Sequence, residues 1–257
     1  MSDYLLETKG LTIQFGGHVA VSDVSFQIKR HTFTSIIGPN GAGKTTFFNL
    51  ISGQLKPTAG QVIFQGRDIT KMPVHQRTRL GLGRSFQLTN VFPNLSVLEN
   101  VRVAVQAASG GGFRLFSHYK KFHRYEERAM ELLTLAHLDG KEGHLAKHLS
   151  HGDKRKLEIA ILLALEPDVL LLDEPTAGMS LEEVPQIIEV IRSLKDSGQH
   201  TVLLIEHKID MVLGLSDALA VLFNGKLLAQ GSPDEIMQNE LVQSAYLGGL
   251  YDDAVNG

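Results

Sequence analysis

Gly38-Pro39-Asn40-Gly41-Ala42-Gly43-Lys44-Thr45 fits the pattern G-x4-G-K-[ST]. This segment follows a β-branched run that ends at Ile37 and precedes a helical pattern over 44–51, the setting in which the pattern binds phosphate. Glycines are needed there because backbone N–H groups must curl closely around an anion. A plain glycine turn is the alternative interpretation, and the flanking strand and helix disfavour it. The sequence therefore predicts a nucleotide phosphate loop.

The residues of this loop have distinct expected roles. The helix that begins near Lys44 points its positive end at the phosphates, and the Lys44 ammonium is expected to reach the β- and γ-phosphates. The Thr45 hydroxyl is expected to ligate Mg²⁺. The loop alone does not separate a kinase from a GTPase or a mechanical ATPase. The predicted nucleotide-binding residues of the loop are Gly38, Pro39, Asn40, Gly41, Ala42, Gly43, Lys44, Thr45 and Thr46.

Composition narrows the class of protein further. In this 257-residue chain apolar residues make up 43% and charged residues 21%, which is typical of a globular protein rather than a disordered one. With no cysteine we expect no disulfide and no thiolate zinc site, and a net charge of −3 gives no general argument for nucleic acid binding. The longest uninterrupted apolar run, 159–165, has 7 residues, whereas a spanning helix needs about 20. The N-terminal segment MSDYLLETKG lacks the features of a signal peptide.

The order of hydrophobic patterns predicts an α/β fold. Alternating patterns over 10–15 and 24–28 predict half-buried strands and an antiparallel β layer. Helical patterns dominate from about 95 to 165, which predicts a helical insertion into the core. Continuous apolar runs separated by helical patterns predict the buried strands of a largely parallel sheet, over 32–37, 169–172 and 201–205.

Some local details also follow from residue types. Asn224-Gly225 predicts a β-hairpin. Ser180 and Glu183 predict a capping box at the start of the next helix, and Pro185 is expected to cost that helix one backbone hydrogen bond. The basic stretch 119–128 is expected to be an exposed loop or a helix end.

Two adjacent acids, Asp173 and Glu174, follow the apolar strand over 169–172. Asp173 can hold Mg²⁺ through water, and Glu174 is placed to orient or deprotonate an attacking water. A solvated strand tip is the alternative, and the phosphate loop upstream makes it the weaker interpretation.

Further motifs occur in a fixed order around these two. They are Phe15, Arg84-Ser85-Phe86-Gln87, Leu149-Ser150-His151-Gly152-Asp153, Asp173-Glu174-Pro175-Thr176 and His207. Together with the phosphate loop, they resemble the motifs of the ATP-binding subunits of ABC transporters, over nearly the whole chain. The resemblance implies an α/β P-loop NTPase (RecA-like) core, an antiparallel β subdomain and an inserted α-helical signature subdomain.

The resemblance also implies a role for each motif, with ATP and Mg²⁺ as cofactors. Phe15 would stack on the adenine, and Gln87 would couple the ATP site to membrane helices. The implied catalytic residues are Glu174, His207 and Gln87, with His207 contacting the γ-phosphate. The implied metal ligands are Thr45, Gln87 and, through water, Asp173.

The segment 149–153 matches the family's signature, which binds the γ-phosphate held by a second subunit. Ser150 can cap a helix that starts near 151, which leaves N–H groups available to an anion. His151 and Asp153 depart from the usual LSGGQ, and Ser180 stands where many relatives carry Asp, so the strength of activation stays open. The residues expected to contact the partner's ATP are Ser150, His151, Gly152 and Asp153.

The resemblance divides the chain into parts. Residues 1–90 and 159–235 are expected to form the nucleotide-binding core with the antiparallel β subdomain. Residues 91–158 are expected to form the helical signature subdomain, and 236–257 a C-terminal helical tail.

Four segments resemble those of importers of branched-chain amino acids and of urea or short amides: 98–100, 177–180, 225–231 and 245–248. The insert over about 107–128 resembles the longer of the two ATPase subunits of such importers. We therefore expect an ATPase that powers uptake of branched-chain (hydrophobic) amino acids. It would pair with a second ATP-binding subunit, as a hetero- or homodimer, and dock on transmembrane permease subunits at the cytoplasmic face of the inner membrane.

A solute-binding protein would be an indirect partner, and no nucleic acid is expected. The alternatives are a urea or short-amide importer, a lipopolysaccharide or lipid exporter, and, outside transport, a soluble ABC ATPase acting on nucleic acid.

Two features have simpler interpretations. His144, His148 and His151 invite a metal site, but Ser150 is expected to break the helix between the last two, so solvated histidines are favoured. Phe92, Leu95 and Val97 could be core residues or could contact a membrane subunit.

Overall fold

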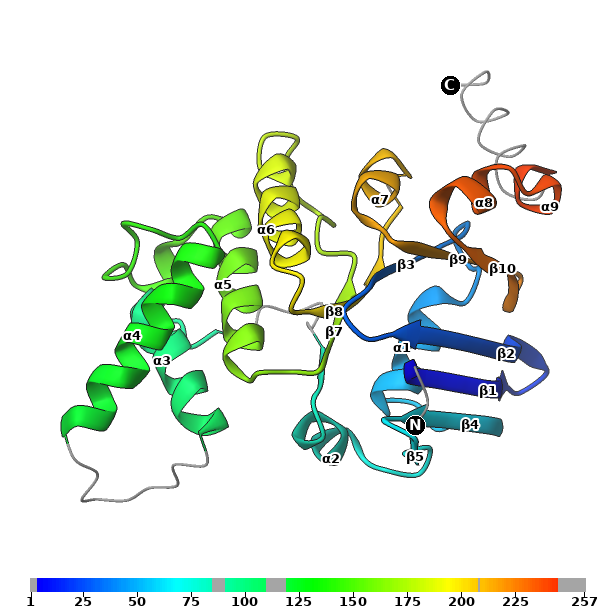
Figure 1. Cartoon of the computed structure of the whole chain (residues 1–257), viewed down its shortest axis with the longest axis horizontal. Helices are drawn as coiled ribbons and strands as arrows, with labels where there is room; N and C mark the ends of the chain where they lie inside the picture. The colour runs from blue at the N-terminus through cyan, green and yellow to red at the C-terminus, as the bar shows by residue number, and fades with distance from the viewer. Residues whose placement is uncertain (1–3, 85–90, 110–118, 208, 245–257) are drawn as a thin grey trace.

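The computed structural model describes residues 4–84, 91–109, 119–207 and 209–244, with the backbone alone for 119–122 and 210. This part of the chain contains two sheets, and helices cover one side and one end (Figure 1). The order of strands and helices confirms the α/β fold expected from the sequence.

The first sheet is antiparallel and has the strand order β2-β1-β4-β5. Its long strands, β1 (Tyr4–Phe15) and β2 (His18–Lys29), are each about twice the length that the alternating patterns predicted. In β1 the reason is Gly10, at φ +56, which lies within a shift of register between Thr8 and Leu11, and in β2 Asp23, at φ +52, lies within the next shift, between Val24 and Val21. Such a bulge breaks the alternation of side chains and hides the strand continuity from sequence analysis. The remaining strands are β4 (Ala59–Phe64) and β5 (Arg67–Asp68).

The second sheet has the order β10-β9-β3-β8-β7-β6, with β9 to β6 mutually parallel and β10 antiparallel to β9. The three central strands are fully buried, which explains why they read as continuous apolar runs. Asn224 and Gly225 both have positive φ in the turn between β9 and β10, which confirms the predicted hairpin. The six strands are β3 (Phe33–Ile37), β6 (Leu82–Arg84), β7 (Val169–Asp173), β8 (Thr201–Ile205), β9 (Ala218–Phe223) and β10 (Lys226–Gly231).

Helix α1 (Lys44–Ser52) joins the two sheets. Its side chains Phe47, Phe48 and Leu50 pack in one apolar cluster with residues of β1, β2 and β4 and with one face of the second sheet. Phe47 meets Phe26 of β2 edge to face, with ring centroids 5.6 Å apart. The strand–loop–helix unit of the phosphate loop is therefore anchored on both sides by the core.

The other face of the second sheet packs against helices, in a second apolar cluster. Those helices are α3 (Val97–Ala108), α4 (Tyr119–Leu135), α5 (His151–Ala164), α6 (Val184–Asp196) and α7 (Ile209–Leu215), with a short 3-10 turn η1 (Ala146–His148) before α5. Helices α3, α4 and α5 extend away from the sheets at one end of the molecule (Figure 1). Shorter helices complete the described chain, α2 (Val74–Arg79), α8 (Pro233–Met237) and α9 (Glu240–Val242).

The stretch 119–128 is the first part of α4, as the helix-end alternative expected, and the buried side chains Ala129, Leu132 and Leu133 hold that helix against its neighbours. Two other local predictions need correction. Only half of the capping box at Ser180 and Glu183 forms: the Glu183 carboxylate accepts from the Ser180 N–H, but the Glu183 N–H donates to the Ser180 carbonyl and not to its hydroxyl, and the N-cap of α6 is Glu183. Pro185 costs no hydrogen bond, because it lies in the first turn of α6, where the N–H has no helical partner.

Arg77 ties α2 to the end of α1 and has only 1% of its surface exposed. Its guanidinium donates hydrogen bonds to the carbonyl oxygens of Leu50 and Ile51 at the end of α1, and to those of Thr70 and Met72. Burial lowers the pKa of Arg77 to about 10, which leaves the side chain charged at neutral pH. The last carbonyls of α1 therefore have a cation at the negative end of the helix.

We expect Arg77→Leu to lower the free energy of unfolding by about 2–4 kcal/mol, because several buried carbonyl oxygens lose their donors at once. Urea unfolding followed by circular dichroism measures this change. Arg79→Leu, at an exposed position of the same helix, is the matched control. Equal stability of the two variants would contradict the assignment of Arg77 as a capping residue of α1.

Candidate functional site

The phosphate loop follows β3 and leads directly into α1, as the sequence predicts. Gly43 adopts φ +94, and a Cβ at that position would lie 2.5 Å from the carbonyl oxygen of Ala20. The position therefore requires glycine on grounds of both conformation and space. Gly43 is also the N-cap of α1, and it makes no side-chain cap bond, so the first N–H groups of the helix remain directed at the loop.

Lys44 folds over its own loop. Its Nζ donates to the carbonyl oxygens of Gly38 at 2.8 Å and Pro39 at 3.0 Å. Burial lowers the pKa of Lys44, while the carboxylates of Glu174 and Asp173 act in the opposite direction. The loop ammonium and the two acids after β7 thus share one electrostatic environment, although 129 and 130 residues separate them in the chain.

Asp173 ends β7 and is almost completely buried. Arg84, at the end of the neighbouring strand β6, donates from Nη2 to Asp173 Oδ2 at 3.0 Å and from Nη1 to Ser52 Oγ at 2.6 Å. Burial raises the pKa of Asp173, and the Arg84 guanidinium opposes that rise. The ion pair therefore favours the ionised carboxylate at the place where the sequence analysis expects a magnesium ligand.

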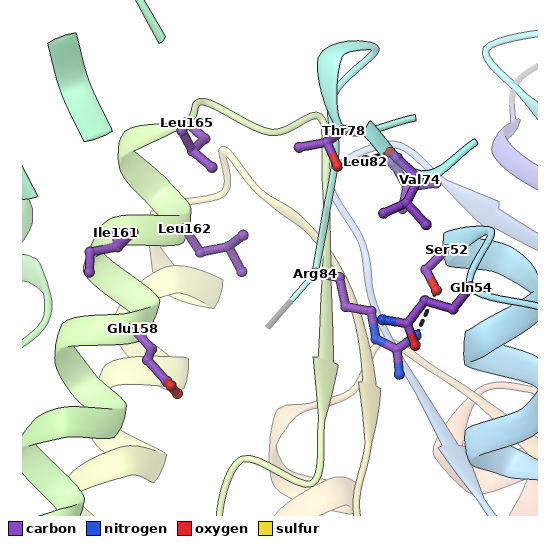
Figure 2. Close-up of a pocket in the computed structure, with 10 residues that line it drawn as sticks. All are labelled: Ser52, Gln54, Val74, Thr78, Leu82, Arg84, Glu158, Ile161, Leu162 and Leu165. Atoms are coloured by element: carbon purple, nitrogen blue, oxygen red, sulfur yellow. Dashed lines mark hydrogen bonds between the residues drawn. The ribbon is translucent and has the colours of Figure 1, made fainter. Parts of the chain in front are cut away.

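Arg84 also borders a pocket, whose lining residues are drawn in Figure 2 and whose volume is about 140 Å³. Leu82 lies on one side of this pocket, and Glu158 and Leu162 of α5 lie on the other. The pocket thus lies between the second sheet and α5, one of the three helices that extend away from the sheets. One residue of its wall, Arg84, contacts Asp173 directly.

Glu174 and His207 meet across the ends of β7 and β8. His207 Nε2 lies 2.7 Å from Glu174 Oε1, and both side chains are partly exposed. Glu174 adopts φ +45, an uncommon conformation for a residue with a side chain. Its backbone N–H donates to the carbonyl of Ile205, which fixes the strand end while the carboxylate turns toward His207. The two residues that the sequence assigned separately therefore form one hydrogen-bonded pair.

Glu206 is a positioning residue that the sequence analysis missed. It is buried, and its Oε1 accepts from the Thr176 N–H at 3.0 Å and from the Thr176 hydroxyl at 2.8 Å. Its Oε2 accepts from the N–H of His207 at 3.2 Å. Glu206 therefore joins the loop that carries Glu174 to the loop that carries His207. The available signal was an acid directly between a buried strand and the predicted histidine.

The signature segment lies at the start of α5. Ser150 is the N-cap and accepts from the N–H of Asp153 at 3.1 Å, which confirms the predicted cap. The Asp153 carboxylate forms ion pairs with Lys141 and Lys156 and is mostly buried. The departure from the usual glutamine thus provides an anchor between α5 and the segment after α4.

The remaining predicted site residues are placed as follows. Phe15 ends β1 beside the turn to β2, where it is 49% exposed, as an adenine-stacking side chain requires. Gln87 lies outside the described residues, so its predicted metal and coupling roles stay predictions. His151 is exposed in the first turn of α5. Within the described ranges no group of three or more His, Cys, Asp or Glu side chains is arranged to hold a metal ion.

The described residues therefore place the phosphate loop, Asp173, Glu174 and His207 around the ends of β3, β7 and β8. Thr45 and Asp173 offer oxygen atoms, the ligand type that Mg²⁺ prefers, and nucleotide sites commonly hold Mg²⁺ through one or two protein oxygens plus phosphates. The arrangement can bind a nucleoside triphosphate and place a carboxylate next to its terminal phosphate.

Comparison with known proteins adds the family. The sequence profile of the ABC transporter family matches residues 21–177. This chain belongs to the ABC transporter family. A second profile, that of branched-chain amino acid ATP-binding cassette transporters, matches residues 226–252. Within the described parts of this cassette, no helix has the length and apolar character needed to cross a membrane.

Two relatives of this cassette are named for different transport functions. It is 40% identical over 255 residues to the high-affinity branched-chain amino acid transport ATP-binding protein LivG of Salmonella typhimurium, covering 96% of this chain and 99% of that protein. It is 36% identical over 244 residues to the lipopolysaccharide export system ATP-binding protein LptB of Acidithiobacillus ferridurans, covering 95% and 97%.

Solved structures agree with the fold. The ADP conformation of MJ1267, an ATP-binding cassette of an ABC transporter, matches with a TM-score of 0.79 at 28% identity, covering 96% of this chain and all of that one. The dimeric cassette MJ0796 bound to ADP and phosphate matches with a TM-score of 0.72 at 26% identity, covering 89% and 98%. The P-loop core with its added β and helical parts is thus confirmed as an ABC ATPase fold.

We expect Glu206→Ala to lower kcat for ATP hydrolysis by about 10- to 100-fold with little change in KM, because Glu174 and His207 lose the residue that sets their relative position. Steady-state ATPase assays over a range of ATP concentrations measure both constants. Glu189→Ala, which removes an exposed acid of α6, is the control. An unchanged kcat in Glu206→Ala would show that the two loops hold their positions without this carboxylate.

Proposed function

We propose that this cassette hydrolyses ATP in a pair with a second ATP-binding subunit and thereby powers import of branched-chain (hydrophobic) amino acids. The observation that carries the hydrolytic part is the Glu174–His207 pair at the end of β7 and β8, in the same electrostatic environment as Lys44 of the phosphate loop. The importer part is supported by the relative LivG and by the profile over 226–252.

In the proposed reaction, the loop N–H groups and Lys44 bind the phosphates, and Phe15 stacks on the adenine. Thr45, Gln87 and Asp173 would hold Mg²⁺, which neutralises charge on the phosphate oxygens when bound. Glu174 accepts a proton from the attacking water, and His207 both orients that carboxylate and contacts the γ-phosphate. The Arg84 guanidinium favours the ionised form of Asp173, the form suited to its role toward the metal.

Pairing with a second ATP-binding subunit is part of the proposal, because the signature at the start of α5 resembles the segment that binds the γ-phosphate held by a second subunit. Ser150, His151 and Gly152 would face the ATP held by the partner. Asp153 anchors the signature helix through Lys141 and Lys156. The dimeric state of the similar cassette MJ0796 supports this arrangement.

The expected membrane partners are permease subunits, with a solute-binding protein as an indirect partner, at the cytoplasmic face of the inner membrane. The pocket beside Arg84 (Figure 2) supports a route from such a partner to the ATP site, since Arg84 also forms an ion pair with Asp173. The chain carries a net charge of −3, which gives no support to a soluble ABC ATPase acting on nucleic acid. Urea or short-amide import stays an alternative, and the similarity to LptB keeps lipopolysaccharide export another.

We expect Glu174→Gln to retain ATP binding while hydrolysis falls at least about 100-fold, because the amide cannot accept the proton of the attacking water. Nucleotide binding is measured by fluorescence titration and turnover by phosphate release. Lys44→Ala serves as the contrasting variant, in which ATP affinity itself falls because the phosphates lose a cation. Unchanged turnover in Glu174→Gln would remove Glu174 from the role of base.

The proposed substrate is tested by reconstituting this chain with the membrane subunits that co-purify with it. We expect uptake of labelled leucine into vesicles on addition of ATP, with competition by isoleucine and valine but not by urea. The Glu174→Gln complex is the control that contains every subunit and lacks hydrolysis. ATP-dependent uptake of urea, or extraction of a lipid without uptake of leucine, would favour one of the alternatives.

A further inference from the structure

The N-terminal end of α5 carries an anion that belongs to the same chain. The N–H of Gly152 donates to Glu183 Oε1 at 3.0 Å, although the two residues lie 31 positions apart. Gly152 is in the first turn of α5, where N–H groups have no helical partner and carry partial positive charge. Glu183 therefore takes one of the donors that the signature offers to a phosphate.

The second oxygen of this carboxylate is also held. Glu183 Oε2 accepts from the N–H and from the hydroxyl of Ser180, both at 3.3 Å. These hydrogen bonds lower the pKa of Glu183, with that from Gly152 as the largest cause, and the Ser150 side chain contributes in the same direction. Glu183 is thus an anion at neutral pH that contacts Ser150 and Gly152, two of the four residues expected to contact the partner's ATP.

Space at the signature agrees with this contact. A Cβ placed on Gly152 would lie 3.1 Å from Glu183 Oε1 and 3.2 Å from the terminal methyl of Met179. The carboxylate and Met179 therefore cover Gly152 directly. A phosphate oxygen cannot reach the Gly152 N–H while Glu183 occupies this position.

We propose that Glu183 occupies, in the separated subunit, the anion position that the γ-phosphate of the partner's ATP takes in the closed pair. Closure then exchanges one anion for the other at the Gly152 N–H. This inference rests on the proposed function, because it assumes that the signature binds ATP held by a second subunit. Glu183 acts as a positioning residue that sets how readily the signature accepts a phosphate.

The surroundings of Glu183 allow the exchange. Its side chain is half-buried rather than enclosed, and it stands in the irregular segment between β7 and α6. In that segment Leu181 is 87% exposed and Gly178 adopts φ +72. A negative phosphate near Glu183 would repel the carboxylate. Because one side of the segment is open to solvent, the displaced carboxylate can move into water.

The test compares Glu183→Gln with Glu182→Gln in the Glu174→Gln background, in which ATP is retained. Both substitutions remove one negative charge from neighbouring positions, but only Glu183 contacts the Gly152 N–H, and glutamine keeps an oxygen that can accept that bond. The chain is studied in the assembly in which it purifies, alone or with a second ATP-binding subunit. Light scattering or an inter-subunit fluorescence signal gives the ATP concentration for half-maximal closure.

We expect Glu183→Gln to lower that ATP concentration about 5- to 10-fold, because a competing anion no longer holds the signature in the unoccupied state. Glu182→Gln is expected to leave it unchanged. If Glu183 only supported the shape of the signature, its replacement would leave closure unchanged or weaken it, and either outcome would overturn the proposal. An equal gain in Glu182→Gln would do the same, since net charge would then account for the effect.

A second measurement needs no partner and no ATP. In the chain labelled with ¹⁵N-glycine, millimolar inorganic phosphate is expected to shift the amide signal of Gly152 in Glu183→Gln and not in the parent protein. Equal shifts in both proteins, or none in either, would overturn the exchange. A chain that neither binds ATP nor pairs would instead refute the proposed function, whereas the phosphate titration would still decide the role of Glu183.

Discussion

The site depends on the register of three parallel strands. Strand β8 lies between β3 and β7, and its last residue, Ile205, pairs with Ile36 on one side and with Asp173 on the other. Because parallel strands end at the same edge of a sheet, the segments that follow all three strands meet there. Those segments contain the phosphate loop, Glu174 and His207. A shift of one residue in either pairing would move Asp173 or His207 away from Lys44, so the buried apolar strands are also the scaffold of the chemistry.

The part of the site predicted from sequence is the part encoded by short local patterns. The phosphate loop, the acids after β7 and the Ser150 cap each combine a residue type with a neighbouring strand or helix, and the structure places all of them where that pattern requires. The length of β1 was underestimated for the same reason, because its bulge at Gly10 breaks the local pattern. Hydrophobic periodicity therefore predicts a strand or helix correctly where the chain keeps one period, and it fails where a single residue interrupts that period.

Contacts between distant segments were beyond that kind of analysis. Arg84 and Asp173 are 89 residues apart, Glu206 and Thr176 are 30 apart, and Arg77 reaches the end of α1 from a different helix. In sequence, Glu206 and Arg77 are single charged side chains outside any motif, and the motif that contains Arg84 does not indicate a contact with Asp173. What identifies them is burial together with hydrogen bonds to residues far away in the chain, since a buried charge is costly without fixed partners. The residues that position the site are thus visible only once the strands are paired.

The segment from Glu174 to Glu183 connects several of these contacts along one stretch of chain. At one end Glu174 faces His207 on the chain's own nucleotide side, and Glu206 clamps Thr176 two residues later. At the other end Glu183 covers Gly152 of the signature, which would serve the nucleotide of the partner. In the proposed pair, a connection of ten residues would link a carboxylate at one ATP site with a carboxylate at the other. Because the contact of Glu206 with Thr176 holds one end, a displacement of Glu183 would be absorbed between 177 and 183, where Gly178 provides the backbone freedom. If both subunits of the pair are built this way, phosphate at the signature of one subunit would change the position of a segment that begins at Glu174, the proposed base for the ATP bound by that same subunit. Two ATP sites can act together only if they are physically coupled in such a way.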